Sequence, residues 1–217
     1  EDSSGRAKSH FSSFHGGMIA ESFMTMLLYN NNNLKPAVEN KRVANWERGA
    51  FGTRSMLRNQ SLLIVGYGNI GYHCAEVAKA FGMKVSGACR NLVRESNCEL
   101  LNIADISEFI GEYDHILDLL PGDESTEEFF STDLFSRMKE GASFYNFGRG
   151  VTVDENVLCK SLESGKLKFA GLDVFAEEPL SEKSPLWKVD NCVMTPHSSC
   201  IYSDYLDLFI DELKEKL

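Results

Sequence analysis

Residues 62–71 have the sequence LLIVGYGNIG, in which an aliphatic run precedes Gly66, Gly68 and Gly71 in the spacing Gly-x-Gly-x-x-Gly. The aliphatic run predicts a buried strand, and apolar residues at helical spacing from Ile70 to Phe81 predict a helix directly after the glycines. A glycine-rich turn between a strand and a helix is the fingerprint of a dinucleotide-binding site. This stretch therefore predicts the fold of the segment around it.

Each glycine of this fingerprint has its own expected role. Gly66 would permit the tight turn after the strand, Gly68 would let the backbone approach a pyrophosphate, and Gly71 would let the helix pack closely on the sheet. The backbone amides at the helix start, near Asn69 and Ile70, would then face the phosphates. The alternative is a purely structural glycine turn, which the strand before it and the helix after it disfavour.

The rest of the chain alternates short β-rich runs with helical runs, which is typical of a parallel sheet with crossover helices. The predicted class is α/β, a doubly wound parallel sheet that forms a Rossmann-type dinucleotide-binding domain with flanking hinge helices. Further strands are predicted at 84–88, 115–120, 144–146, 169–173 and 192–194, and further helices at 106–110, at 134–138 and from an N-cap at Asp154 to near Gly165.

Both ends of the chain differ from this centre. We divide it into an N-terminal segment with a linker helix (1–58), the dinucleotide-binding domain (59–200) and a C-terminal hinge helix (201–217). Residues 19–29 form an apolar helix, and the polar run 30–33 is expected to be a loop. The C-terminal helix is predicted from one apolar face, made of Leu206, Phe209, Ile210, Leu213 and Leu217.

The composition excludes several classes of protein. The net charge is −10, and no cluster of Lys and Arg is present to bind nucleic acid or an anionic membrane. The six cysteines form no Cys-x-x-Cys pair, which is typical of free thiols in a reducing compartment, so the cytoplasm is expected. The sequence shows no signal-peptide pattern and no apolar run long enough to span a bilayer. No metal is expected, because His10, His15, His73 and Cys74 lack further ligands at metal-site spacing.

Three ionisable residues in the C-terminal half carry a possible chemistry: Arg149 in NFGRG, Glu178 in DVFAEEP and His197 in TPHSS. A guanidinium can bind a carboxylate with two hydrogen bonds, and an imidazole can pass a proton near neutral pH. A carboxylate beside the imidazole can keep it protonated. The alternative is that Arg149 and Glu178 form a surface ion pair and that His197 is a residue of a turn.

The end of the second predicted strand bears on the choice of dinucleotide. NAD sites place an acid there for the ribose hydroxyls, whereas this strand ends in Cys89 and Arg90. Arg90 and Arg94 could meet the additional phosphate of NADP. NADP is therefore slightly preferred over NAD, with the alternative that Arg90 is a solvated loop charge and Cys89 merely tolerates NAD.

Several segments together resemble the D-isomer-specific 2-hydroxyacid dehydrogenases over about residues 15–205. The resemblance implies that Arg149 binds the substrate carboxylate, His197 is the acid/base, and Glu178 is its partner. It also implies that Asp173 holds the nicotinamide carboxamide. Further contacts to the cofactor are implied at Pro121, Thr126, Phe147, Gly148 and Ser199. The matching segments are HGGMIAE, GYGNIG, LLPGDEST, MKEGASFYNFGRG, VDENVL, GLDVFAEEPL, SPLW and NCVMTPH.

By this resemblance, the function is hydride transfer between NAD(P)H and a small 2-oxo or 2-hydroxy acid, in a complete protein expected to be a homodimer. The family's N-terminal substrate lobe is not found here, so the chain is expected to be catalytically incomplete. It also departs from the family pattern at Tyr29, Asn30 and Asn31 and at residues 198–200. The alternative function is a non-catalytic nucleotide-binding regulatory module of the corepressor type.

Overall fold

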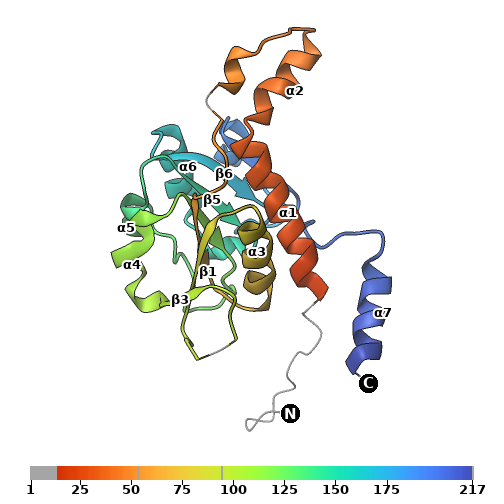
Figure 1. Ribbon diagram of the computed structural model, residues 1–217. Coiled ribbons are helices and arrows are strands. Elements are labelled where there is room, and N and C mark those ends of the chain that lie inside the picture. Colours follow the sequence, from red (N-terminus) through yellow and green to blue (C-terminus); the bar gives the residue numbers. More distant parts are fainter. Residues whose placement is uncertain (1–13, 53, 94, 217) are drawn as a thin grey trace.

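A seven-stranded, all-parallel sheet forms the centre of the protein, with the strand order β3-β2-β1-β4-β5-β6-β7 (Figure 1). The computed structural model describes residues 14–52, 54–93 and 95–216. The order reverses between β1 and β4, so a crevice is expected where the carboxyl ends of these two strands diverge. This arrangement confirms the predicted doubly wound α/β fold.

The strands are β1 (Ser61–Val65), β2 (Lys84–Cys89), β3 (Glu99–Asn102), β4 (His115–Asp118), β5 (Ala142–Asn146), β6 (Leu167–Leu172) and β7 (Cys192–Met194). The α-helices are α1 (Phe14–Asn31), α2 (Leu34–Arg42), α3 (Asn69–Ala80), α4 (Ile106–Phe109), α5 (Thr132–Arg137), α6 (Glu155–Glu163) and α7 (Tyr205–Lys216). Short 3-10 turns lie at Gly49–Phe51, Ile103–Asp105, Ile110–Glu112, Gly150–Thr152 and Pro185–Lys188.

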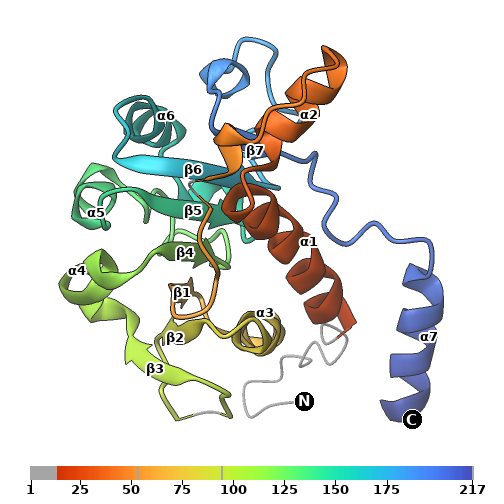
Figure 2. The ribbon, with the colours of Figure 1, turned by 45° about the horizontal axis from the view of Figure 1, so that its top comes forward.

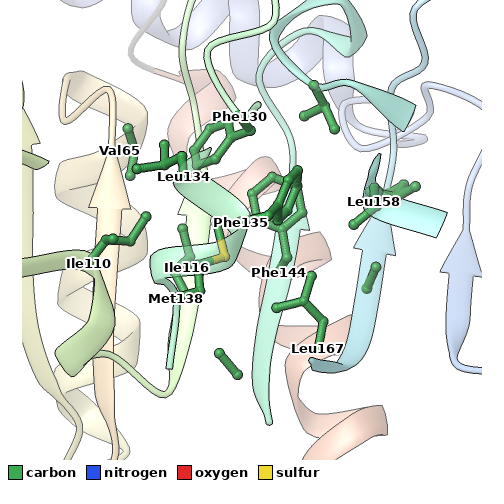
Figure 3. Close-up of a cluster of buried hydrophobic side chains, with 14 of the residues drawn as sticks. Val65, Ile110, Ile116, Phe130, Leu134, Phe135, Met138, Phe144, Leu158 and Leu167 are labelled. Carbon is green, nitrogen blue, oxygen red and sulfur yellow. The ribbon is translucent and has the colours of Figure 1, made fainter. Parts of the chain in front are cut away.

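Helices cover both faces of the sheet, and each face has its own apolar core (Figure 2). On one face α1 and α3 pack on β1, and Phe23 and Leu27 of α1 are completely buried. On the other face α4, α5 and α6 cover a cluster rich in aromatic rings (Figure 3). The rings of Phe130 and Phe144 there meet edge to face, with their centroids 4.8 Å apart. The two cores hold the sheet from both sides and fix the ends of its strands.

The predicted start of α6 is confirmed. Asp154 is the N-cap, and its Oδ1 accepts the backbone amides of Asn156 (3.0 Å) and Val157 (3.1 Å). These contacts satisfy N–H groups that have no partner within the helix. Gly165, with a φ of +80°, lies two residues after the last helical residue, as expected for a helix end.

Three features differ from the sequence-based expectation. The polar run 30–33 is not wholly a loop, because Asn30 and Asn31 belong to α1. Tertiary hydrogen bonds explain this: the Asn30 amide donates to Ser143 Oγ (2.9 Å), and the Asn31 amide donates to Ser55 O (2.6 Å). Strand β3 and helix α2 were not predicted; β3 is a short, half-exposed edge strand, and α2 buries no residue.

Helix α7 forms within the predicted range and lies apart from the sheet (Figures 1 and 2). Its expected apolar face is covered only in part among the described residues: Leu206 is 69% exposed and Ile210 43%, whereas Phe209 and Leu213 are half-buried. Leu217, the last member of that face, lies outside the described residues. The contacts of α7 to α1 come from Phe209, whose ring meets the ring of Phe14 edge to face with the centroids 5.8 Å apart, and from Glu212, whose Oε2 accepts the Phe14 amide at 3.0 Å.

Candidate active site

The turn after β1 has a geometry that requires glycine at its first position. Gly66 has a φ of +87°, and a Cβ added there would lie 2.8 Å from the backbone carbonyl carbon of Leu119. The amides of Gly66 and Tyr67 both donate to Ala88 O, at 2.9 and 3.1 Å. The turn is therefore held between the carboxyl ends of β2 and β4, at the point where the strand order reverses.

Gly68 differs from Gly66, because nothing in the protein itself excludes a side chain there. A Cβ on Gly68 would have Gly66 O, 3.8 Å away, as its nearest neighbour. At Gly71 a Cβ would lie 3.2 Å from Ile64 Cγ2, so this glycine brings α3 close to β1. The helix begins at Asn69, where backbone amides of the first turn lack partners within the helix. The backbone thus fits a pyrophosphate placed beside Gly68.

The carboxyl end of β2 carries a buried thiol and an exposed cation. Cys89 is buried, and its Sγ donates to Asn91 O at 3.2 Å, while Arg90 is exposed. Hydrogen bonds from Ser125 lower the pKa of Asp123 in the loop after β4, and the charge of Arg90 lowers it further. Arg90 therefore lies near enough to the loop after β4 for its charge to act on Asp123. Arg94 lies outside the described residues.

The loop after β4 presents Pro121 and is shaped from within by Thr126. Pro121 is exposed, whereas Thr126 is buried. The Thr126 hydroxyl donates to Pro121 O and accepts the Asp123 amide at 3.1 Å. The Thr126 hydroxyl thus holds the loop, while Pro121 is exposed on its surface.

Two glycines fix the backbone of Arg149 in the loop after β5. A Cβ on Gly148 would lie 2.6 Å from Leu120 O, and one on Gly150 would lie only 1.8 Å from the Phe175 carbonyl carbon. The Arg149 backbone is therefore wedged between the ends of β4 and β6. Its side chain is exposed, and Nη1 donates to Gly148 O at 2.7 Å. Phe147, which precedes Gly148 in this loop, is buried against Phe23 of α1.

Asp173, directly after β6, holds the segment that carries the histidine. It is completely buried, and its Oδ1 accepts the Thr195 hydroxyl (2.5 Å) and the Ser198 amide (2.9 Å). Its Oδ2 accepts the Ser199 amide at 3.0 Å. The His197 amide donates to Asp173 O at 2.7 Å and so helps to keep His197 at a φ of +49°. A non-glycine residue at positive φ is uncommon and is maintained by such surrounding contacts.

His197 and Glu178 form a hydrogen-bonded pair. His197 Nδ1 donates to Glu178 Oε2 at 2.7 Å, and Glu178 Oε1 accepts the Phe175 amide at 3.0 Å. Burial acts to raise the pKa of Glu178, but the hydrogen bonds from His197 and Phe175 outweigh it, and the pKa is lowered. Nδ1 is thus engaged by a carboxylate, which leaves Nε2 for another partner. The turn at Phe175 links this pair to Gly150 and so to Arg149.

An apolar cavity of about 630 Å³ adjoins the pair. Phe175, Leu180, Trp187 and Met194 provide much of its wall, and His197 lies at its edge together with Glu178. An apolar wall beside a charged pair is typical of a small-molecule site. Among residues 14–52, 54–93 and 95–216, no group of three or more His, Cys, Asp or Glu side chains is placed to hold a metal ion.

The other histidines that the structure describes, His15, His73 and His115, lie apart from this site, and His115 Nε2 lies 2.7 Å from Gln60 Oε1 at the start of β4. His15 Nε2 lies 3.2 Å from the Tyr205 hydroxyl. His73 packs so closely on Gly16 that a Cβ added to Gly16 would lie 2.2 Å from His73 Cδ2. His10 lies outside the described residues. None of the described helices combines the length and the apolar character needed to cross a membrane.

Sequence reasoning missed one part of this region, the buried acid Asp118 at the end of β4 and its partner Thr152. The signal was present, because Asp118 interrupts an otherwise apolar strand end in HILDLL. A buried acid at the carboxyl edge of a parallel sheet is a candidate functional group.

The fold and this edge of the sheet define a dinucleotide-binding α/β domain with a histidine–carboxylate pair. A model of the D-isomer specific 2-hydroxyacid dehydrogenase NAD binding domain matches residues 24–199. The chain is 43% identical over 138 residues to a probable 2-ketogluconate reductase from Dictyostelium discoideum, a match that covers 62% of this chain and 41% of the relative.

Two further matches agree. Glyoxylate/hydroxypyruvate reductase B from Escherichia coli (strain SMS-3-5 / SECEC) is 33% identical over 186 residues, which cover 82% of this chain and 56% of the relative. A solved structure of a D-isomer specific 2-hydroxyacid dehydrogenase family protein from Aeromonas salmonicida subsp. salmonicida A449 has a TM-score of 0.83 at 32% identity. That match covers 93% of this chain and 64% of the other.

The chain therefore belongs to the D-isomer specific 2-hydroxyacid dehydrogenase family, and the matched part is the NAD-binding domain of that family. This confirms the resemblance found in the sequence. The chain spans about half the length of the curated relatives it matches.

Proposed function

We propose that this chain provides the cofactor-binding and acid–base part of an oxidoreductase that transfers a hydride between NAD(P)H and a small 2-oxo or 2-hydroxy acid. The observation that carries the proposal is the 2.7 Å contact between His197 and Glu178, at the same sheet edge as the glycine turn and Arg149. The relatives support it, because their names describe reductases of 2-ketogluconate, glyoxylate and hydroxypyruvate. Nucleotide binding alone does not require this pair, so the pair favours the enzyme over a purely regulatory module.

In this proposal each residue has one task in the reaction. A bound reduced nicotinamide supplies the hydride for the carbonyl carbon of the 2-oxo acid. His197 Nε2 donates a proton to the developing alkoxide, and Glu178 at Nδ1 stabilises the imidazolium. Arg149 holds the substrate carboxylate with two hydrogen bonds and stabilises negative charge on the neighbouring oxygen. In the direction of oxidation, neutral His197 accepts the proton instead.

The cofactor side of the proposal uses the residues around the crevice. Gly66, Gly68 and Gly71 with the start of α3 would hold the pyrophosphate, and Asp173, which anchors the histidine segment, would hold the nicotinamide carboxamide. Further contacts come from residues that border the crevice or support it: Asn69, Ile70, Pro121, Thr126, Phe147, Gly148 and Ser199.

NADP is the slightly preferred cofactor. No acid follows β2, and Arg90 is exposed next to the buried Cys89. A guanidinium in this place can form charge-assisted hydrogen bonds to the 2′-phosphate. Arg90 also attracts Asp123, so the phosphate competes with a carboxylate that is already nearby.

The complete protein is proposed to be a homodimer. Within this chain the proposed divisions are the N-terminal segment (1–58), the dinucleotide-binding domain (59–200) and the C-terminal hinge helix (201–217). Helix α2 and the segment after it project from the sheet (Figure 2). Large apolar side chains of this region are exposed. Val43 is 73% exposed, Trp46 93% and Met56 78%, which is typical of a surface covered by a partner. Light scattering of the complete protein would test the dimer.

The six free cysteines favour a reducing compartment such as the cytoplasm.

The proposed activity is tested by NADPH oxidation with glyoxylate, hydroxypyruvate and 2-ketogluconate, using the complete protein. Wild type should turn over at least one of them, and His197→Asn should lower kcat by about 10²–10⁴, the usual share of general acid catalysis. His73→Asn is the matched control, because His73 packs against Gly16 of α1 and is not part of the His197–Glu178 pair. A His197→Asn enzyme with wild-type turnover would refute the assigned role.

A further inference from the structure

Asp118 is a buried acid that the proposed mechanism does not use. It is the last residue of β4, and its side chain is completely buried. Its Oδ1 accepts the Leu120 amide at 2.8 Å, and its Oδ2 lies 2.5 Å from Thr152 Oγ1. The carboxyl group therefore connects the end of β4 to the loop that carries Arg149.

Thr152 lies between two acceptors. Its Oγ1 is 2.5 Å from Asp118 Oδ2 and 2.6 Å from Arg149 O. A hydroxyl has a single proton to donate, so it can serve only one of the two while Asp118 is ionised. When Asp118 is protonated, its O–H donates to Thr152, and Thr152 donates to Arg149 O. Only this form satisfies every contact.

Burial favours the protonated form. It raises the pKa of Asp118 to about 7, and the hydrogen bonds from Thr152 and Leu120 oppose that rise only in part. The geometry and the burial therefore agree on a carboxyl that changes its proton occupancy near neutral pH.

The groups packed around Asp118 add little charge. In the sheet it pairs with Val65 of β1 and Asn146 of β5, and neither side chain is ionisable. The loop on its far side contributes Arg149, whose guanidinium is exposed, and the loop after β4 contributes the exposed Asp123. No ionised neighbour is among the causes of the shift.

We propose that Asp118 is a positioning residue for Arg149. When Asp118 is protonated, the Thr152 hydroxyl donates to the Arg149 carbonyl. When Asp118 is ionised, the hydroxyl donates to the carboxylate instead, and the Arg149 carbonyl loses this hydrogen bond. This inference rests on the proposed function, which assigns the substrate carboxylate to Arg149. The Asn146 side-chain amide (3.0 Å) and the Thr152 backbone amide (3.3 Å) also donate to this carbonyl, so the hydroxyl supplies the third restraint. Ionisation also adds a negative charge beneath the site of the substrate carboxylate. Both effects weaken substrate binding as pH rises.

The expected signature is a split between KM and kcat. KM for the 2-oxo acid should rise about twofold to tenfold between about pH 6 and 8.5, the equivalent of one hydrogen bond, while this ionisation leaves kcat unchanged. Asp118→Asn should keep KM at its low-pH value throughout. Its amide is always neutral, donates to Thr152 and accepts from Leu120, as the protonated acid does.

Two further variants and one control separate this role from a merely structural one. Thr152→Val removes the relay and should raise KM across the whole pH range, whereas Thr152→Ser keeps the hydroxyl and should restore the wild-type profile. Asp114→Asn is the control, since Asp114 lies just before the opposite end of β4 and pairs with Lys139 (2.6 Å). It should leave the rise of KM in place. Thermal unfolding would verify that each variant is folded.

The experiment measures KM and kcat of the complete protein from about pH 6 to 8.5 with saturating NADPH. A KM that does not change in wild type, or that rises equally in Asp118→Asn, would overturn the inference while leaving the proposed function intact. A wild-type protein that binds NADPH but reduces no 2-oxo acid would overturn the proposed function, and the role of Asp118 with it.

Discussion

Replacing Glu178 by glutamine removes one charge from the site and almost no volume. Glu178 uses Oε2 for His197 Nδ1 and Oε1 for the Phe175 amide. Glutamine has one oxygen, so it can keep one of these two contacts and must turn its NH₂ group toward the other. Oxygen toward Phe175 leaves the NH₂ group facing Nδ1, which favours neutral histidine. Oxygen toward His197 keeps a hydrogen bond but loses the negative charge.

The size of the effect follows from the exposure of the pair. The side chains of His197 and Glu178 are 48% and 36% exposed, so solvent screens their interaction. We expect the imidazolium to lose about 0.5–1.4 kcal/mol of stabilisation, which corresponds to about 0.4–1 pH unit. Reduction requires the imidazolium as proton donor. The alkaline limit of the reduction rate should therefore move to lower pH by this amount.

The assay is the pH profile of kcat/KM for NADPH-dependent reduction by the complete protein, from about pH 5 to 10. Glu177→Gln is the matched control, because Glu177 is the exposed neighbour of Glu178 in the sequence, whereas the hydrogen bond to His197 comes from Glu178. The control should follow the wild-type profile. An unshifted Glu178→Gln profile, or a shift to higher pH, would refute the reasoning.

Three further predictions concern binding and stability. Gly68→Val should abolish NADPH binding in calorimetry without lowering the unfolding temperature, because the nearest atom beyond the two chain neighbours, Gly66 O, lies 3.8 Å from the added Cβ. Unchanged binding would contradict the assignment of the pyrophosphate to this turn. Cys89→Asp should reverse the order of NADPH and NADH affinities, and Arg90→Ser should weaken NADPH binding by about tenfold to a hundredfold, with Arg137→Ser on α5 as control. Burial lowers the pKa of His115 to about 3, so its contribution to the free energy of unfolding is fully present above about pH 6.5. Below that pH the free energy of unfolding should fall by up to about 1.4 kcal/mol per pH unit until about pH 3. Urea unfolding of His115→Gln as a function of pH should show a smaller loss of stability in acid.

The parts of the fold that the sequence predicted are those with strong local signals. The strand, glycine turn and helix around residues 62–81 are defined by neighbours in the chain, and so is the Asp154 N-cap. Strand β3 and helix α2 gave no comparable signal, because both lie at the periphery and bury little. Asn30 was assigned to a loop on its polarity, but its partner Ser143 is distant in the sequence.

The site shows the same limit. Motif resemblance singled out Arg149, Glu178 and His197, and the structure places the last two in direct contact. The contact of Asp118 with Thr152 crosses from one strand end to the next, so spacing along the chain could not reveal it. Likewise, the need for glycine at Gly150 comes from the backbone at Phe175, which only the folded sheet brings near.

The most direct test of the central claim follows the hydride itself. Complete protein is incubated with glyoxylate or hydroxypyruvate and NADPH that carries deuterium on the transferred position of the nicotinamide, and the product is examined by mass spectrometry. We expect a 2-hydroxy acid with deuterium on the former carbonyl carbon, formed about 10²–10⁴ times more slowly by His197→Asn. A product without deuterium, or no product from a folded protein that binds NADPH, would contradict the account.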